Sequence, residues 1–273
     1  MKIIAVIPAR YGSKRFAGKP LAELAGKPMV VHVYERAASS PILDAVLVAT
    51  DDERIAEAVI RANGRVVMTA KGHRSGTDRV AEAVAGMNLR QMDIVINIQA
   101  DQPLFDPKCI EQVVSPLFLD DSLPMATLVH GITDDREIDN PNNVKAVLGE
   151  DGSAIYFSRS RIPFFRSNDI PKIYYKHLGI YAFRRHFLTT FAQLPEGKLE
   201  AAEKLEQLRV LENGFRIKAV ETEFHSLGVD TPEQLAWVAQ TLRGGLWPTP
   251  LRPSLGVMRE AKRRLYGQEA IDY

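Results

Sequence analysis

The chain has 273 residues, of which 45% are hydrophobic and 25% charged, with 35 Lys and Arg against 34 Asp and Glu. This length suits one large α/β domain or two small ones, and the balanced charge gives no reason to expect a nucleic-acid or membrane partner. The single cysteine, Cys109, excludes an intrachain disulfide and a cysteine-based zinc site. The apolar run at the start is too short for a signal peptide and is interrupted by Pro8, so we expect a cytoplasmic protein.

Apolar strands alternate with helical patterns through about residue 118. We predict strands at 2–9, 45–51, 65–69 and 93–101, with helices at 26–40, 52–64 and 76–87. This alternation is typical of an α/β protein with a mostly parallel, doubly wound sheet.

The pattern changes over about residues 120–185, where the apolar segments 124–130, 143–149, 154–159 and 175–183 predict an antiparallel excursion or edge strands. A single strong helix is predicted over 199–214, followed by a strand over 216–224 and a helix over 231–242 with Thr231 as its N-cap. We therefore expect one domain over residues 1–243. The basic tail, 244–273, would form a helix that packs on a partner subunit or stays in solvent, and its role is open.

The loop after the first strand is basic and contains glycines. Within ten residues it carries four cations, Arg10, Lys14, Arg15 and Lys19. Loops at this edge of an open α/β sheet border the ligand crevice, and Gly12 and Gly18 allow backbone N–H groups to approach phosphate oxygens. The loop is therefore a candidate phosphate site, with a solvated basic loop as the alternative; it matches neither of the common glycine-rich phosphate motifs.

Two aspartates have the position and chemistry of Mg²⁺ ligands. Asp101 ends the apolar strand "INIQAD", and Asp230 lies just before the helix that begins near Thr231. Mg²⁺ takes one or two carboxylates together with substrate oxygens. Without further context, either residue could equally be an ordinary turn or helix-entry residue.

Eight motifs in order carry a family resemblance over roughly residues 1–240: "IPARYGSKRFAGKPL", "VATDDERI", "SGTDRVAEA", "NIQADQP", "YFSRSRIPF", "YKHLGIYAF", "LEQLRVL" and "GVDTPEQL". This chain resembles the sugar nucleotidyltransferases, and among them the 3-deoxy-manno-octulosonate cytidylyltransferases (CMP-Kdo synthetases). The resemblance implies a nucleotide-diphospho-sugar transferase-like fold and Mg²⁺-dependent transfer of CMP from CTP to an acidic eight-carbon sugar for lipopolysaccharide biosynthesis. It also implies a homodimer, for which residues 120–185 are the candidate surface.

The resemblance also implies a set of site residues. The catalytic residues would be Lys19, Asp101 and Asp230, and the two aspartates would hold the metal. The nucleotide would contact Arg10, Arg15, Lys19, Arg74, Ser75, Gly76 and Gln99. The sugar would contact Gln99, Arg159, His177, Tyr181, Glu206 and Gln207. Without the motif, Glu206 would be read as part of a solvated helix face, and His177 as a structural histidine.

Three positions depart from the family pattern. Ala100 stands where Gly is common, Gln102 where Glu is common, and Asp78 where many relatives carry Glu. These changes leave the expected metal ligands intact and bear on substrate detail. The alternatives are the same chemistry on the 8-amino-3,8-dideoxy sugar, a transferase for another nucleotide, and a catalytically silent relative that binds nucleotide.

Overall fold

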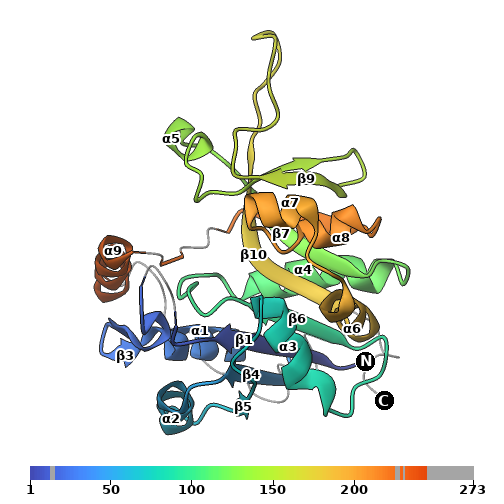
Figure 1. Cartoon of the computed structure of the whole chain (residues 1–273). Helices are drawn as coiled ribbons and strands as arrows, with labels where there is room; N and C mark the ends of the chain where they lie inside the picture. The colour runs from blue at the N-terminus through green and yellow to red at the C-terminus, as the bar shows by residue number, and fades with distance from the viewer. Residues whose placement is uncertain (13–15, 225–227, 230, 245–273) are drawn as a thin grey trace.

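The computed structural model describes residues 1–12, 16–224, 228–229 and 231–244. In this part of the chain, a sheet of nine strands forms the centre of the molecule (Figure 1). Its main path runs in the order β11, β7, β10, β6, β1, β4, β5. These strands are Ile217–Glu221 (β11), Met125–Gly131 (β7), Tyr175–Arg184 (β10), Ile94–Ile98 (β6), Ile3–Ala9 (β1), Ala45–Thr50 (β4) and Val66–Met68 (β5).

Only one strand of this main path runs against the others. β10 is antiparallel to both of its neighbours, β6 and β7, whereas every other adjacent pair on the path is parallel. The predicted class, a mostly parallel α/β sheet with an antiparallel part, is confirmed. The segment predicted over 124–130, which forms β7, lies inside the sheet because β11 pairs with its other side.

Helices cover both faces of the sheet. One face packs against α1 (Met29–Ala38), α2 (Glu53–Arg61) and α4 (Lys108–Leu119), and the other against α3 (Gly76–Ala85), α6 (Arg185–Gln193) and α8 (Leu208–Glu212). Along β1, Ile3, Ala5 and Ile7 enter the first core, while Ile4 and Val6 enter the second. A strand buried on both faces needs a continuous apolar run, which is what the sequence shows.

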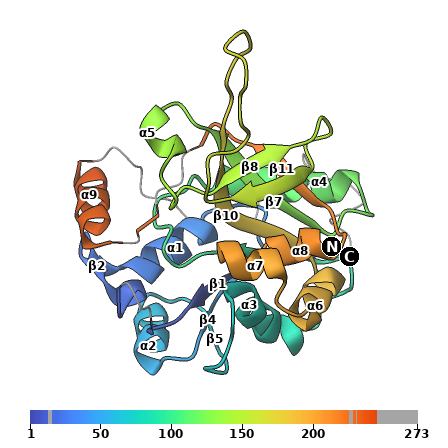
Figure 2. The same ribbon diagram turned by 45° about the horizontal axis from the view of Figure 1, so that its top comes forward.

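The excursion is a hairpin beside the main sheet. Strands β8 (Lys145–Leu148) and β9 (Ala154–Ser158) pair with each other, and β8 also pairs with the start of β10. A short helix, α5 (Asp135–Ile138), precedes them. The long connection between β9 and β10, residues 159–174, projects away from the body of the molecule in both ribbon views (Figures 1 and 2).

The single helix predicted over 199–214 is wrong. Two short helices occur instead, α7 (Lys198–Glu203) and α8, and the chain breaks between them at Lys204, whose φ of 53° is left-handed. The helical periodicity is real, but tertiary contacts override it because the break directs Glu206 and Gln207 toward other elements. The predicted end at Gly214 is correct, with φ of 76°.

A smaller layer lies beside the end of β1. It contains the 3₁₀ turn η1 (Lys19–Leu21), the short strands β2 (Glu23–Leu24) and β3 (Lys27–Pro28), and α9 (Pro232–Arg243). The predicted N-cap of α9 is confirmed, because Gln234 N–H donates to the Thr231 hydroxyl and the Gln234 side chain accepts in return. No helix in the described ranges is both long and apolar enough to cross a bilayer.

Candidate active site

The basic loop leaves the sheet directly after β1 and returns at η1. Gly18 has φ of 71°, and its N–H donates to the Tyr11 carbonyl at 3.0 Å. A Cβ at this position would lie 3.1 Å from the Tyr11 ring. The Arg54 guanidinium stacks over the same Tyr11 ring, 3.5 Å from its centroid. Glycine is therefore required for the close turn that delivers Lys19 to the crevice.

Lys19 and Asp101 form an ion pair where β1 and β6 end. The Lys19 ammonium lies 2.6 Å from Asp101 Oδ2, with the two side chains 12% and 34% exposed. The residue before Asp101, Ala100, is buried, and the Asp101 carbonyl accepts the Val229 N–H at 2.8 Å. The ion pair and this hydrogen bond together join three segments of the chain, and the Asp101 carboxylate stays accessible to a ligand.

A first pocket opens beside this ion pair. Its lining includes the end of β1, η1, the start of α3 and the end of β6, through Pro8, Ala9, Arg10, Lys19, Arg74, Ser75, Gly76, Arg79, Gln99, Ala100 and Asp101. Ser75 caps α3, because its hydroxyl accepts the Asp78 N–H while the Asp78 carboxylate accepts the Ser75 N–H. A pocket with several cations and a helix N-terminus is suited to an anion. Arg79, which was not predicted as a site residue, also lines this pocket.

A second pocket continues from the first. The two share Arg10, Arg74, Ser75, Gly76 and Gln99, so they form one cleft. The second pocket adds four residues of the expected sugar set, Arg159, Tyr181, Glu206 and Gln207. It is also lined by Gly179, Glu196, Glu200, Lys204 and Arg209. The structure therefore gathers most of the residues predicted for the two ligands along one continuous path, whereas His177 lines neither of these two pockets.

Two side chains of the α7–α8 break form part of the floor of the second pocket. The Tyr181 hydroxyl donates to Gln207 Oε1 at 3.1 Å, and Gln207 Nε2 is buried without a partner in the part of the chain that the structure describes. Glu206 accepts from the Thr77 hydroxyl at 2.8 Å and from the Thr77 N–H at 3.3 Å. Burial raises the pKa of Glu206, while hydrogen bonds from Thr77 and Ser75 lower it.

His177 is held as a neutral side chain. It packs edge-on against Phe157, with ring centroids 5.0 Å apart, and beside Tyr181 at 5.3 Å. Its Nε2 lies 2.9 Å from the Thr127 hydroxyl. Burial lowers the pKa of His177 to about 3. At neutral pH this histidine therefore offers hydrogen bonding rather than positive charge.

Arg159 is anchored by main-chain carbonyls. Its Nε donates to the Glu203 carbonyl at 2.7 Å and its guanidinium to the Pro141 carbonyl at 2.9 Å. The Lys145 ammonium is buried and donates to three further carbonyls, including that of Arg159 at 2.7 Å. The arginine thus lines the second pocket from a fixed position.

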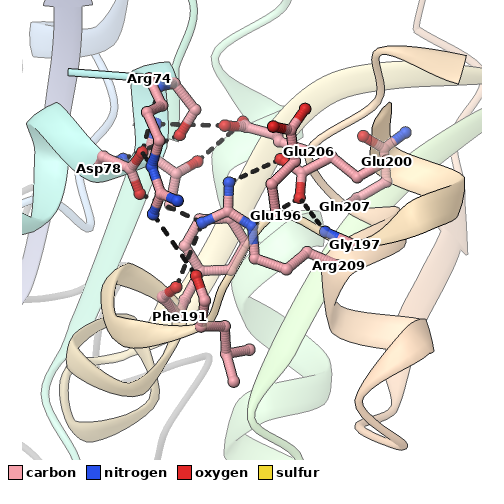
Figure 3. Close-up of polar contacts among 12 residues, drawn as sticks. Arg74, Asp78, Phe191, Glu196, Gly197, Glu200, Glu206, Gln207 and Arg209 are labelled. Carbon is pink, nitrogen blue, oxygen red and sulfur yellow. Dashed lines mark hydrogen bonds and ion pairs between the residues drawn. The ribbon is translucent and has the colours of Figure 1, made fainter. Parts of the chain in front are cut away.

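A buried cluster closes the wall behind the second pocket (Figure 3). Arg209 is 1% exposed and makes a bidentate contact with Glu200, at 2.8 and 2.6 Å. It also lies 3.4 Å from Asp78, and 4.5 Å from the centroid of the Phe191 ring. Figure 3 shows this guanidinium between the α7–α8 segment on one side and Asp78 and Phe191 on the other. The shorter Asp78, unusual by the family pattern, still caps α3 and reaches Arg209.

A third pocket adjoins the ion pair on the side of the excursion. It is lined by Asp101, Gln102, His177 and residues of the 134–143 segment, with Trp237 of α9. Gln102 Oε1 is buried without a partner among the described residues, and its Nε2 lies 3.3 Å from the position of a Cβ on Gly179. The departure at Gln102 thus places a neutral amide in the pocket that Asp101 also lines.

Two predicted site residues, Arg15 and Asp230, lie outside the described residues, as does the tail from residue 245. Sequence reasoning also missed Thr77 and Asn97, which are fully buried beneath the cleft. The signal for Asn97 was available, because it is a polar residue inside the apolar strand 93–101. Such a residue must have a buried partner, and that partner is Thr77.

The chain belongs to the cytidylyltransferase family, whose sequence model matches residues 4–219. It is 55% identical over 243 residues, 89% of this chain and 98% of the relative, to a protein of Syntrophus aciditrophicus (strain SB) named 3-deoxy-manno-octulosonate cytidylyltransferase. It is also 54% identical over 238 residues, 86% of this chain and 96% of the relative, to a protein of Shewanella frigidimarina (strain NCIMB 400) named 8-amino-3,8-dideoxy-manno-octulosonate cytidylyltransferase.

A solved structure agrees with these sequence relatives. It is described as CMP:2-keto-3-deoxy-manno-octonic acid synthetase complexed with CTP, and it matches with a TM-score of 0.83 and 44% identity. The match covers 89% of this chain and 99% of the other. The shared fold therefore extends over nearly all of the described residues.

Proposed function

We propose that this protein transfers CMP from CTP to 3-deoxy-D-manno-octulosonate (Kdo), releasing pyrophosphate, for lipopolysaccharide biosynthesis. The anomeric oxygen of the sugar attacks the α-phosphorus, the bond from that phosphorus to the β-phosphate oxygen breaks, and the hydroxyl proton is lost to solvent. The observation that carries the proposal is the Lys19–Asp101 ion pair beside a cleft that holds cations at one end and polar groups at the other. The family membership and the relatives support the same reaction.

The first pocket is assigned to the nucleotide. Arg10 and Lys19, together with Arg15, bind the triphosphate, and Arg74 with the Ser75–Gly76 turn binds the base and ribose. Charge accumulates on phosphoryl oxygens as the α-phosphoryl group transfers, so fixed cations and positioning supply most of the catalysis. Lys19 is the cation assigned to the α-phosphoryl group and the departing pyrophosphate.

Mg²⁺ is proposed as the cofactor, held by Asp101 and Asp230. The donor set fits this ion, because Mg²⁺ in phosphoryl-transfer sites binds one or two carboxylates along with substrate phosphates. The described part of the site supplies the accessible Asp101 carboxylate, and Val229, which precedes Asp230 in sequence, donates its N–H to the Asp101 carbonyl. When bound, the ion would offset the negative charge of the phosphates and of the attacking oxygen.

The second pocket is assigned to the sugar acid. Arg159 binds the carboxylate, while Gln99, Tyr181, Glu206 and Gln207 contact hydroxyl groups or the side chains that do so. His177 is assigned to the same sugar from the adjoining third pocket. The unpartnered Gln207 Nε2 supports this assignment, because a buried donor is stable when a ligand oxygen accepts from it. The neutral His177 suits a hydroxyl better than a carboxylate.

The 8-amino-3,8-dideoxy sugar is the second candidate acceptor. It is favoured by one observation, the 54% identity to the Shewanella frigidimarina relative named for that substrate. A buried carboxylate at the C8 end would favour the ammonium group, whereas neutral groups would suit the hydroxyl.

A homodimer is proposed through the excursion. Three large apolar side chains of the projecting 159–174 segment are exposed, Phe164 at 88%, Ile170 at 55% and Ile173 at 54%. Apolar groups gathered on an arm that projects from the molecule are typical of a protein interface. Sedimentation at micromolar concentration should give a dimer, and Phe164→Asp should shift it to monomer. A wild-type monomer would contradict this proposal.

We propose a cytoplasmic location, supported by the free, buried Cys109 and by the use of CTP, a nucleotide of that compartment. Cell fractionation with an antibody to the protein would test this, and recovery with periplasmic markers would contradict it.

The reaction is tested by pyrophosphate release with CTP, UTP, GTP and ATP, each crossed with Kdo, its 8-amino analogue and N-acetylneuraminate. The proposal expects release only with CTP, only with Mg²⁺ and most efficiently with Kdo. Higher kcat/KM with the 8-amino sugar selects the second candidate, and preference for another nucleotide overturns the CTP assignment. Nucleotide binding with no release for any pair identifies a catalytically silent relative.

A further inference from the structure

A line of four hydrogen-bonded side chains runs beneath the cleft. Gln99 Nε2 donates to Asn97 Oδ1 at 3.1 Å, and Asn97 Nδ2 donates to the Thr77 hydroxyl at 2.9 Å. That hydroxyl donates to Glu206 Oε1 at 2.8 Å. Gln99 and Glu206 line the second pocket, whereas Asn97 and Thr77, at 0% exposure, lie buried between them. The line connects β6, α3 and the α7–α8 break.

Glu206, when ionised, sets the direction of the whole line. Its carboxylate then only accepts, so the Thr77 hydroxyl donates its hydrogen to Glu206, as the Thr77 N–H also does. The Thr77 oxygen is then an acceptor, which requires the NH₂ side of Asn97. The Asn97 carbonyl is left facing Gln99 and requires the NH₂ side of that amide. A reversed amide at any step would place two donors or two acceptors against each other in a buried site.

Hydrogen-bond donors around Glu206 favour its ionised form. The Thr77 N–H also donates to this carboxylate, and Ser75 forms a further hydrogen bond to it. Both residues belong to the N-terminus of α3, a helix of ten residues, where the backbone dipoles favour a negative charge. Burial acts in the opposite direction and has the larger effect, so the pKa of Glu206 is raised overall.

The consequence lies at the other end of the line. With its NH₂ turned down to Asn97, Gln99 presents Oε1 on the remaining side, beside the first turn of α3. This oxygen lies 3.3 Å from the position of a Cβ on Gly76, so a side chain there would crowd it. No group of the described residues donates to this oxygen, although Gln99 lines both pockets of the cleft.

We propose that Asn97 and Thr77 are positioning residues that orient the Gln99 amide, so that its carbonyl oxygen accepts a hydrogen bond from a substrate hydroxyl or amino group. The inference rests on the proposed CMP transfer for the identity of the substrates. The donor could belong to the nucleotide or to the acceptor sugar, because Gln99 borders both pockets. The oriented amide would accept a ligand that carries a donor at this point and reject one that carries only an acceptor.

The kinetic test compares Asn97→Leu, which removes both hydrogen bonds at similar volume, with Gln99→Met, which removes the acceptor itself. Each variant should raise the KM of one substrate about tenfold and leave the other nearly unchanged, and that substrate carries the donor. The double variant should be no worse than Gln99→Met alone, since Asn97 acts only through Gln99. Additive losses, or equal effects on both KM values, would overturn the proposal.

A second pair of variants guards against simple misfolding. Thr77→Val removes the hydroxyl at nearly constant shape and should reproduce the rise in KM. Thr77→Ser keeps the hydroxyl and should have the KM of the wild-type protein. A full loss of activity in Thr77→Ser, with normal thermal unfolding, would contradict the assigned role of the hydroxyl.

One measurement is independent of catalysis. In protein labelled with ¹⁵N-glutamine, the Gln99 side-chain NH₂, assigned by its loss in Gln99→Met, should exchange slowly with solvent and become fast in Asn97→Leu. Fast exchange in the wild-type protein would refute the orientation even if CMP transfer is correct. Slow exchange together with absent CMP transfer would refute the proposed function and leave the orientation in place.

Discussion

Arg209 joins three helices behind the second pocket, and Arg209→Met tests how much this buried charge stabilises the fold. The guanidinium is 1% exposed, and its partners Glu200 and Asp78 are 7% and 9% exposed. Methionine fills similar volume but leaves the buried Glu200 carboxylate without its cation, whereas Asp78 keeps Arg74 at 3.7 Å. Removing one partner of a buried ion pair costs about 3–5 kcal/mol of unfolding free energy. At ~2–4 °C per kcal/mol for a domain of comparable size, the melting temperature should fall by about 6–20 °C.

The assay is urea and thermal unfolding, with two comparison variants. Arg216 is a matched surface arginine that lies 3.4 Å from Asp120 with 53% exposure, so Arg216→Met should cost under ~1 kcal/mol. Adding Glu200→Gln to Arg209→Met should recover part of the loss, because one uncompensated charge is removed. If Arg209→Met and Arg216→Met lower the free energy of unfolding equally, the buried Arg209–Glu200 pair does not stabilise the fold more than a surface ion pair does.

Three further predictions concern the site. Lys19→Ala should lower kcat about 10²–10³-fold, ~2.7–4 kcal/mol, with a smaller effect on CTP binding, and near-normal turnover would remove Lys19 from catalysis. Asp101→Asn and Asp230→Asn should keep the fold but sharply raise the Mg²⁺ concentration needed for half-maximal rate; full activity at ordinary Mg²⁺ in either variant excludes that ligand. His177, with a pKa of about 3 when folded, binds its proton mainly in the unfolded state. The wild type should therefore lose stability relative to His177→Gln as pH falls from ~6.5 toward 3, by at most ~1.4 kcal/mol per pH unit, and parallel stability curves would contradict this.

Much of the sheet could be predicted because local and tertiary preferences agree there. The run from Ile3 to Ala9 is apolar on both faces, and the structure buries both faces between helices. The helix over 199–214 could not be predicted correctly, because nothing local requires Lys204 to adopt a left-handed conformation. The break arises from distant partners, Thr77 for Glu206 and Tyr181 for Gln207, which periodicity does not reveal.

The site was predictable to the extent that family motifs name its residues. The motifs placed Lys19 and Asp101 in one site, and the structure brings them to 2.6 Å. They gave no indication that the Arg159 guanidinium is bound by carbonyls, or that His177 is enclosed by aromatic rings, because both depend on packing between distant segments. The roles of these residues toward a sugar stay predictions.

The proposed function requires that the cleft join CMP to an acidic sugar at the Lys19–Asp101 edge of the sheet. The most direct measurement is mass-spectrometric identification and quantification of the product formed from CTP, Kdo and Mg²⁺, alongside the pyrophosphate released. We predict one CMP-Kdo for each pyrophosphate. Pyrophosphate accompanied by free CMP and unmodified Kdo would show hydrolysis instead of transfer, and would contradict the assignment of the second pocket to the attacking sugar.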